Sequence, residues 1–169
     1  MTQDMTAADA ASDAVAGEAV ARRQRWMRAL ASAPTAALAA AWEAWSPKPD
    51  VDVIRGPEAG LVMVRSRIDA RGAKFNLGEA TVARATVRLH GGALDGDVVG
   101  TAYVLGTDLE HARLAAIFDG LLADESQRAT ALAEVIAPLE TAMAERDAER
   151  RADARATLVD FFTVSREHA

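Results

Sequence analysis

Residues 75–89 read FNLGEATVARATVRL, and the second half of this stretch alternates in polarity from one residue to the next. Read as a β-strand, it places small and apolar side chains on one face: Ala83, Ala85, Val87 and Leu89. The other face would carry Val82, Arg84, Thr86 and Arg88. An apolar face has to be buried against another layer, so the stretch predicts a half-buried strand. The alternation leaves open whether Arg84 and Arg88 face solvent or hold an anion.

Other strand-like segments lie on both sides of this one. They are VDVIR (51–55), GLVMVRSRI (60–68) and VVGTAYVLG (98–106). The links between them are short and contain turn residues: Gly56-Pro57, DARG (69–72) and HGGALDGD (90–97). Because links of this length join antiparallel neighbours, we expect a small antiparallel sheet of three to four strands.

Helical periodicity frames the strands at both ends. Before the strands we expect a helix over 17–33 and a second one opened by Pro34. After them we expect helices from Thr107, from about residue 126, and over 140–157. Thr107 and Glu110 have the spacing of a capping box, which predicts the helix start. The fold class is therefore α+β, with N-terminal and C-terminal helices flanking the sheet.

The length of 169 residues suits one domain, and the composition locates its boundaries. Residues 1–16 are rich in Ala and Asp and poor in large apolar residues, so we expect a mobile extension there. The extension lacks the basic start of a secretion signal. We expect residues 17–169 to form a single α+β domain, and we expect a cytoplasmic protein without a membrane span.

The bulk composition excludes several function classes. A formal net charge of −6 argues against general nucleic-acid binding, which depends on cations that displace phosphate counterions. The chain has no cysteine, which excludes thiolate nucleophiles and Cys-based metal sites. Phosphate-loop, dinucleotide-binding, zinc-protease and serine-hydrolase signatures are all missing. With His111 as the one plausible histidine of a site, we expect no metal.

Arginines give the broadest functional signal. Arg65 and Arg67 share one strand face, as Arg84 and Arg88 share another, and antiparallel neighbours would bring both pairs onto one surface. Because Arg84 and Arg88 lie about 13 Å apart along a strand, a polyphosphate or a row of partner carboxylates fits them better than a single phosphate. The alternative is a solvated face on which the arginines pair with acids of the same chain.

Asp108 and His111 lie three residues apart in the first turn of a predicted helix. Their side chains would meet on one face, with Asp108 orienting His111 as a general base or as a donor to an anion. The structural alternative makes Asp108 an acid that complements the helix dipole and His111 a partly buried residue.

The C-terminal region combines a highly charged helix with an aromatic end. Phe161 and Phe162 are two of four phenylalanines and follow the polar helix directly. Exposed aromatic pairs are unusual, so we expect them to be covered, either by the chain folding back or by another chain. Together with Trp26 in the first helix, they are our candidate interface residues, and the helical and aromatic tail is expected to serve assembly.

Six segments resemble the G subunit (PhnG) family of the bacterial carbon-phosphorus lyase system and occur in the family's order. They are RQRWM (23–27), VIRGPEAGLV (53–62), GEATVARATVRL (78–89), GTDLEHA (106–112), IAPLE (136–140) and VDFFT (159–163). Together they span nearly the whole chain after the N-terminal extension. Arg67, Arg84, Arg88, Asp108 and His111 fall on family-like positions, and they form our candidate anion or nucleotide site. Arg65 does not.

The resemblance implies a function in phosphonate catabolism. Family members support formation of α-D-ribose 1-methylphosphonate 5-triphosphate from ATP and methylphosphonate with release of adenine, which is a ribose-triphosphate transfer. The implied partners are the I, H and J subunits and, functionally, the L subunit, in a hetero-oligomer whose main catalytic residues lie outside this chain. ATP is then a co-substrate of the complex, with no cofactor bound by this chain alone. Two other hypotheses stay open: a pure scaffold without substrate contact, and a stand-alone anion-binding domain.

Overall fold

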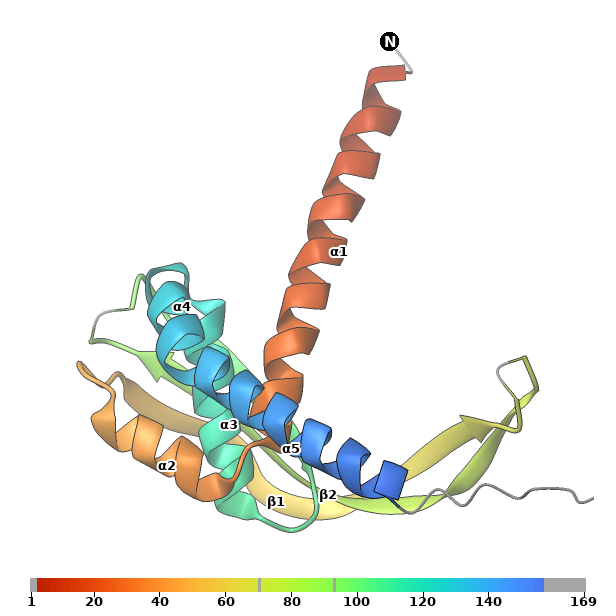
Figure 1. Cartoon of the computed structure of the whole chain (residues 1–169). Helices are drawn as coiled ribbons and strands as arrows, with labels where there is room; N and C mark the ends of the chain where they lie inside the picture. The colour runs from red at the N-terminus through yellow and green to blue at the C-terminus, as the bar shows by residue number, and fades with distance from the viewer. Residues whose placement is uncertain (1–2, 70, 93, 157–169) are drawn as a thin grey trace, which may run out of the picture.

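The computed structural model describes residues 3–69, 71–92 and 94–156 and confirms the α+β class (Figure 1). Its elements follow in this order: α1 (Gln3–Ser32), α2 (Thr35–Ala44), β1 (Asp50–Arg67), β2 (Lys74–His90), β3 (Val98–Leu105), α3 (Leu109–Ala123), α4 (Glu125–Ala131), the π-helical turn η1 (Leu132–Ile136) and α5 (Ala137–Ala156). In the described part of the chain, no helix combines the length and apolar character that crossing a bilayer requires.

The sheet has three antiparallel strands in the order β1-β2-β3. The two segments 51–55 and 60–68, which the sequence separates by Gly56-Pro57, join into the single strand β1. Gly-Pro produces an irregularity in the register with β2 instead of a hairpin turn. The lower number of the predicted three to four strands is therefore correct.

The face of β2 that the sequence predicts to be apolar forms the centre of the core. Its four small and apolar side chains are at most 2% exposed: Ala83, Ala85, Val87 and Leu89. Helix α3 packs against this face and contributes Phe118, which is fully buried. Trp42 and Trp45 of the N-terminal segment meet the Phe118 ring edge-on, with centroid distances of 6.4 and 6.1 Å. Both tryptophans thus pack onto α3.

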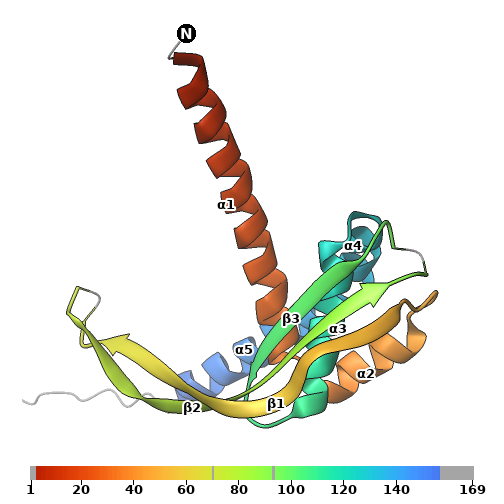
Figure 2. The ribbon, with the colours of Figure 1, turned by 180° about the vertical axis from the view of Figure 1, so that it is seen from behind.

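Helix α1 is longer than the sequence predicts. It begins at Gln3, so the expected start at residue 17 is wrong. Residues 14–25 are exposed, and α1 projects away from the sheet in both ribbon views (Figures 1 and 2). Its C-terminal part packs against the rest of the chain through Trp26, Ala29 and Leu30. The Ala-rich N-terminal residues suit a helix by intrinsic propensity, although they have little apolar surface to bury.

Beyond the reach of β3, strands β1 and β2 continue as a two-stranded extension. Strand β3 pairs only with 82–89 of β2. Residues 61–67 of β1 and 74–81 of β2 pair with each other alone, and we call them the arm. Figure 2 shows the arm extending away from the helices and from β3.

The start of α3 corrects the predicted cap. The N-cap is Asp108, whose side chain accepts a hydrogen bond from the backbone N–H of His111, and Thr107 does not cap the helix. Glu110 does not reach back to complete a capping box but forms an ion pair with Arg113 at 2.6 Å. Asp is as good an N-cap as Thr, so the sequence located the helix start to within one residue.

The C-terminal helical region is more continuous than the sequence indicates. The sequence predicts separate helices from about residue 126 and over 140–157, but the structure has η1 followed directly by α5, with Pro138 in the first turn of α5. A proline lacks an N–H and crowds the carbonyl of the preceding turn, and a π-helical turn is one way to accommodate it. Val135, Ile136 and Leu139 of this region are buried in the core.

Asp124 connects α3 to α4 and gives a pH-dependent prediction. Its carboxylate accepts hydrogen bonds from Ser126 and from the backbone N–H groups of Asp95 and Gln127. Burial by itself would raise the pKa of Asp124, but these hydrogen bonds together hold the pKa below the ordinary value of 3.8. Because this pKa is lower in the folded chain, the stabilisation is present above pH 3.8 and is lost as the pH falls further.

We therefore expect Asp124→Ala to reduce the free energy of unfolding at pH 7 by about 1–2 kcal/mol, the usual cost of a lost N-cap. The difference from wild type should shrink below pH 3.8, where the carboxylate of the wild-type chain becomes protonated. Urea unfolding followed by circular dichroism at pH 7 and at pH 3 measures both values. Exposed Asp153, replaced by Ala, is the control. A pH-independent difference would contradict the assignment.

Candidate functional site

The sheet face opposite α3 carries the two arginines with which the sequence analysis began. Strand pairing places Glu58 opposite Arg84 and Asp52 opposite Arg88. We call this surface the open face and define it by Asp52, Glu58, Arg84, Arg88 and Tyr103, the last of which lies opposite Arg84 on β3. No helix lies in front of this face in Figure 2.

Both arginines of the open face are paired with acids of the same chain. Arg84 Nε lies 2.9 Å from Glu58 Oε1, and Arg88 Nη2 lies 2.5 Å from Asp52 Oδ2. Arg88 lowers the pKa of Asp52, while Arg55 and then Arg84 lower the pKa of Glu58. This arrangement fits the solvated-face interpretation. Anion binding by Arg84 and Arg88 stays a prediction, but a ligand would have to compete with these carboxylates.

Arg67 lies far from the open face, so the expected gathering of four arginines is wrong. It stands opposite Lys74 near the end of the arm, and its Nη1 donates to the Gly72 carbonyl at 3.0 Å. It lies nine positions after Glu58 in β1, which corresponds to about 30 Å along a strand. Arg65 lies in the same region, opposite Asn76.

Asp108 and His111 meet through the backbone of His111 and not through its ring. The Asp108 carboxylate accepts from the His111 N–H at 2.9 Å and from the Thr35 hydroxyl at 2.6 Å. These contacts, led by the Thr35 hydroxyl, lower the pKa of Asp108. His111 Nε2 lies 2.8 Å from the Leu30 carbonyl, to which it donates in the corresponding tautomer. The pair therefore joins α1 and α2 to the start of α3, an arrangement that fits the structural alternative.

Trp26 is a core residue in the described structure. It is 4% exposed, and its indole N–H donates to Asp119 Oδ1 at 2.9 Å. The expectation that Trp26 contacts a partner is thus corrected: its side chain is occupied within the chain. Phe161 and Phe162, the other two candidate interface residues, lie outside the described residues.

Asp119 is the buried polar centre that the sequence analysis missed. It is fully buried in α3 and accepts four hydrogen bonds, from Arg23 Nε and Nη2, from the Trp26 indole and from the Thr101 N–H. The signal was an acidic residue within the apolar stretch IFDGLL (117–122). Buried acids need partners, and this one connects α1, α3 and β3.

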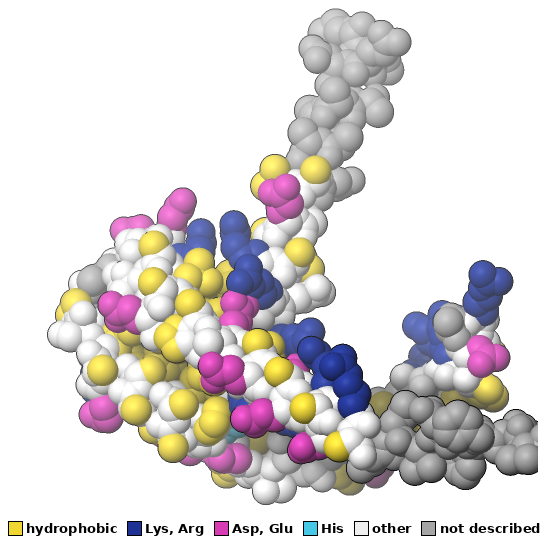
Figure 3. All heavy atoms as spheres, viewed as in Figure 1, with side chains coloured by type: hydrophobic (Ala, Val, Ile, Leu, Met, Phe, Trp, Pro, Cys, Tyr) yellow, Lys and Arg dark blue, Asp and Glu magenta, His cyan; other side chains and the backbone are white. Residues whose placement is uncertain are grey.

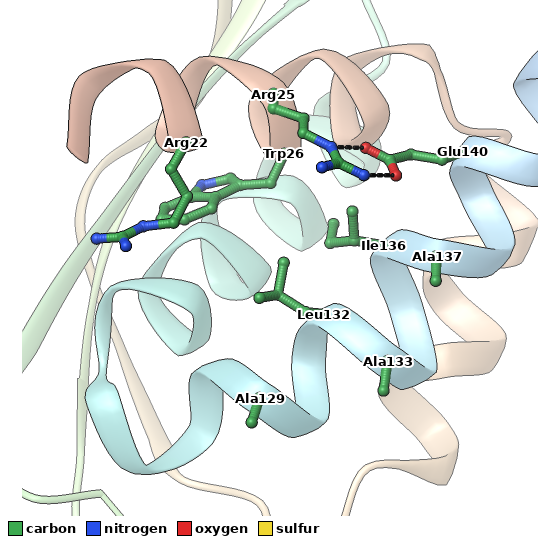
Figure 4. A pocket seen from close by; sticks show the side chains of 9 residues that line it. All are labelled: Arg22, Arg25, Trp26, Ala129, Leu132, Ala133, Ile136, Ala137 and Glu140. Atoms are coloured by element: carbon green, nitrogen blue, oxygen red, sulfur yellow. Dashed lines mark hydrogen bonds and ion pairs between the residues drawn. The ribbon is translucent and has the colours of Figure 1, made fainter. Parts of the chain in front are cut away.

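A cavity of about 440 Å³ lies between α1 and the helices from α4 to α5 (Figure 4). Its walls are mainly apolar, and Arg25 and Glu140 form a bidentate pair at one side, with distances of 2.6 and 2.5 Å. Figure 4 shows Leu132 and Ile136 pointing toward Trp26. Among the residues that line the cavity, the one carboxylate is that of Glu140, which is paired with Arg25, and no histidine or hydroxyl side chain accompanies it. No group of three metal-ligating side chains occurs in the described ranges either.

Comparison with known proteins agrees with the sequence resemblance. The profile of the family described as "Phosphonate metabolism protein PhnG" matches residues 21–167. A curated relative from Rhizobium meliloti (strain 1021), named "Alpha-D-ribose 1-methylphosphonate 5-triphosphate synthase subunit PhnG", is 49% identical over 164 residues, which cover 96% of this chain and 97% of the relative. The chain therefore belongs to the PhnG family of phosphonate metabolism proteins.

Proposed function

We propose that this chain is a subunit of an α-D-ribose 1-methylphosphonate 5-triphosphate synthase in phosphonate catabolism. The observation that carries the proposal is the 49% identity over nearly the whole length of a relative that bears this name. The proposed assembly is a cytoplasmic hetero-oligomer with the I, H and J subunits, aided by L. It would use ATP and methylphosphonate and release adenine, so the transferred unit is the ribose 5-triphosphate.

Within this complex we assign the chain a structural role and place the chemistry on a partner. Four contacts support this assignment. Acids of the same chain neutralise Arg84 and Arg88, Asp108 caps α3, and the His111 ring meets a backbone carbonyl. A triphosphate site is expected to offer unpaired cations, and the open face offers paired ones. The scaffold hypothesis is therefore favoured over substrate contact by this chain.

The test is product formation by the co-expressed subunits with Arg84→Ala or Arg88→Ala in this chain. We expect the rate of triphosphate formation to change by less than about twofold, because each arginine is an exposed partner of a surface ion pair. Arg55→Ala, which removes the other cation on Glu58, is the matched control. A loss of more than about tenfold with an intact complex would restore the anion site, since that is the scale of a direct contact with the reacting phosphates.

If the wild-type chain purifies from the co-expression without any of the other subunits, the proposed function itself is contradicted. Failure of the subunit assignment and failure of the scaffold assignment can be distinguished, because native mass spectrometry measures complex formation and phosphorus NMR measures product formation. Each variant is measured by both methods.

A further inference from the structure

The arm lacks the support that a pair of strands needs in water. Only β1 and β2 contribute to it, because β3 ends its pairing at Val82. A two-stranded ribbon is marginally stable unless a third strand or a helix packs on it. Among the described residues, the outer backbone edges of both arm strands have no further strand, since the sheet order is β1-β2-β3.

Both faces of the arm carry exposed apolar side chains. Leu61 and Met63, on the face that continues from the buried side of the sheet, are 64% and 50% exposed. Val62 and Val64, on the opposite face, are 38% and 37% exposed, and Leu77 of β2 is 63% exposed. Neighbouring residues of a strand point to opposite sides, so a layer on one side of the arm cannot cover all of these exposed apolar side chains. The occupant has to enclose the arm.

The end of the arm is positively charged, although the whole chain has a net charge of −6. Residues 65–79 contain four basic residues, Arg65, Arg67, Arg71 and Lys74, and two acids, Asp69 and Glu79. Figure 3 shows these cations gathered at the far end, next to apolar atoms. An apolar stem with a cationic end is complementary to an apolar groove that has carboxylates where the end arrives.

We propose that the arm inserts into a groove of a partner subunit, a protein of different sequence that covers both faces and presents acidic groups to Arg65, Arg67 and Lys74. The partner also has the free strand edges of the arm available for backbone hydrogen bonds. This inference rests on the proposed function, because it identifies the surface that would hold the chain in the synthase.

Two other occupants fit the arm less well. The chain's own residues 157–169 form one segment, and a single segment laid along the ribbon covers one of its two faces. A second copy of the chain would bring an identical set of cations to a two-fold contact at the arm's end, where like charges oppose association. Both occupants are outcomes of the tests below.

The first experiment shortens the arm. Leu61 and Thr81 are directly opposite each other, so residues 62–80 can be replaced by Asn-Gly, a two-residue turn that joins such a pair. We expect the shortened chain to keep the helical circular dichroism of the full chain, because the core lies outside the arm. In co-expression it should lose its partner subunit. Retention of the partner at wild-type stoichiometry would overturn the proposal.

Point variants keep the proposal testable if the shortened chain fails to fold. Leu61→Asp and Leu77→Asp place a charge on the arm, and Val15→Asp does the same on the exposed part of α1, at 68% exposure. We expect the two arm variants to weaken partner binding by more than about tenfold, as for a buried interface contact, and the control to bind normally. Equal binding by all three would overturn the proposal.

The two other occupants can be tested in the lone chain. Because the chain has no cysteine, a disulfide can form only between cysteines that are introduced. In the lone chain, the double variant Leu77→Cys with Phe161→Cys should not form a disulfide readily. Rapid disulfide formation would identify the chain's own tail as the occupant and overturn the proposal. A lone chain that is dimeric and becomes monomeric with Leu61→Asp would overturn it in favour of a second copy. If the wild-type chain binds no other subunit, the proposed function is contradicted. If the wild-type chain and the arm variants bind the partner equally well, only the proposal for the arm is contradicted.

Discussion

Replacing Gly100 with alanine is expected to reduce the free energy of unfolding by at least about 3 kcal/mol, at the severe end of overpacking effects. A Cβ added at this position would lie 1.9 Å from the Ala116 carbonyl oxygen and 2.5 Å from the Gly120 N. Both neighbours are backbone atoms of α3 and cannot rotate aside. The helix would have to move away from β3 and open the packing around Phe118.

Gly60→Ala is the matched control for this prediction. Gly60 is also a strand glycine, but a Cβ added there meets nothing within 4 Å. We expect its effect on stability to be small, because alanine restricts the unfolded chain without creating a clash. Urea denaturation of both variants, followed by circular dichroism, provides the comparison. Similar midpoints for Gly100→Ala and wild type would show that α3 does not approach β3 as closely as described.

Local periodicity accounts for the parts of the fold that the sequence predicted. The alternation in 82–89 identified the buried face of β2, and the Thr107–Glu110 spacing identified the start of α3 to within one residue. Gly100 carried less information, because a glycine within a strand is consistent with several structures, including a bulge and a close backbone approach. Which of these occurs depends on the helix that packs there, which lies later in the sequence.

The candidate site was less predictable because long-range register determines it. The side-chain face of Arg84 follows from its own strand, but its partner Glu58 lies 26 residues earlier. Register shifts between Val53 and Arg55 and between Arg55 and Glu58 determine which acid stands opposite which arginine. Strand periodicity does not reveal such shifts. Arg67 lies away from the open face for a different reason: the turn at 69–72 places it opposite Lys74, ten residues before Arg84 in β2.

Asp119→Asn is expected to cost about 3 kcal/mol of folding stability, the lower end for breaking a buried ion pair. The carboxylate accepts hydrogen bonds from Arg23, Trp26 and Thr101 and is fully buried. An asparagine has the same shape, but its NH2 group would face one of these donors, so two donors would oppose each other. The Arg23 side chain is 53% exposed and water can solvate it, which keeps the cost from being larger.

Glu140→Gln provides the matched control, because it makes the same chemical change in another bidentate arginine–carboxylate pair, that of Arg25 and Glu140. The Arg25 side chain is 75% exposed and that of Glu140 is 24% exposed, whereas the Asp119 side chain is fully buried. Water can therefore solvate the Arg25–Glu140 pair more easily, and we expect a smaller loss of stability than for Asp119→Asn. Equilibrium unfolding of both variants in urea gives the comparison. If the two variants are equally stable, Asp119 does not hold α1 and β3 to α3. A large loss for Asp119→Asn alone would show that one buried carboxylate fixes the position from which α1 projects.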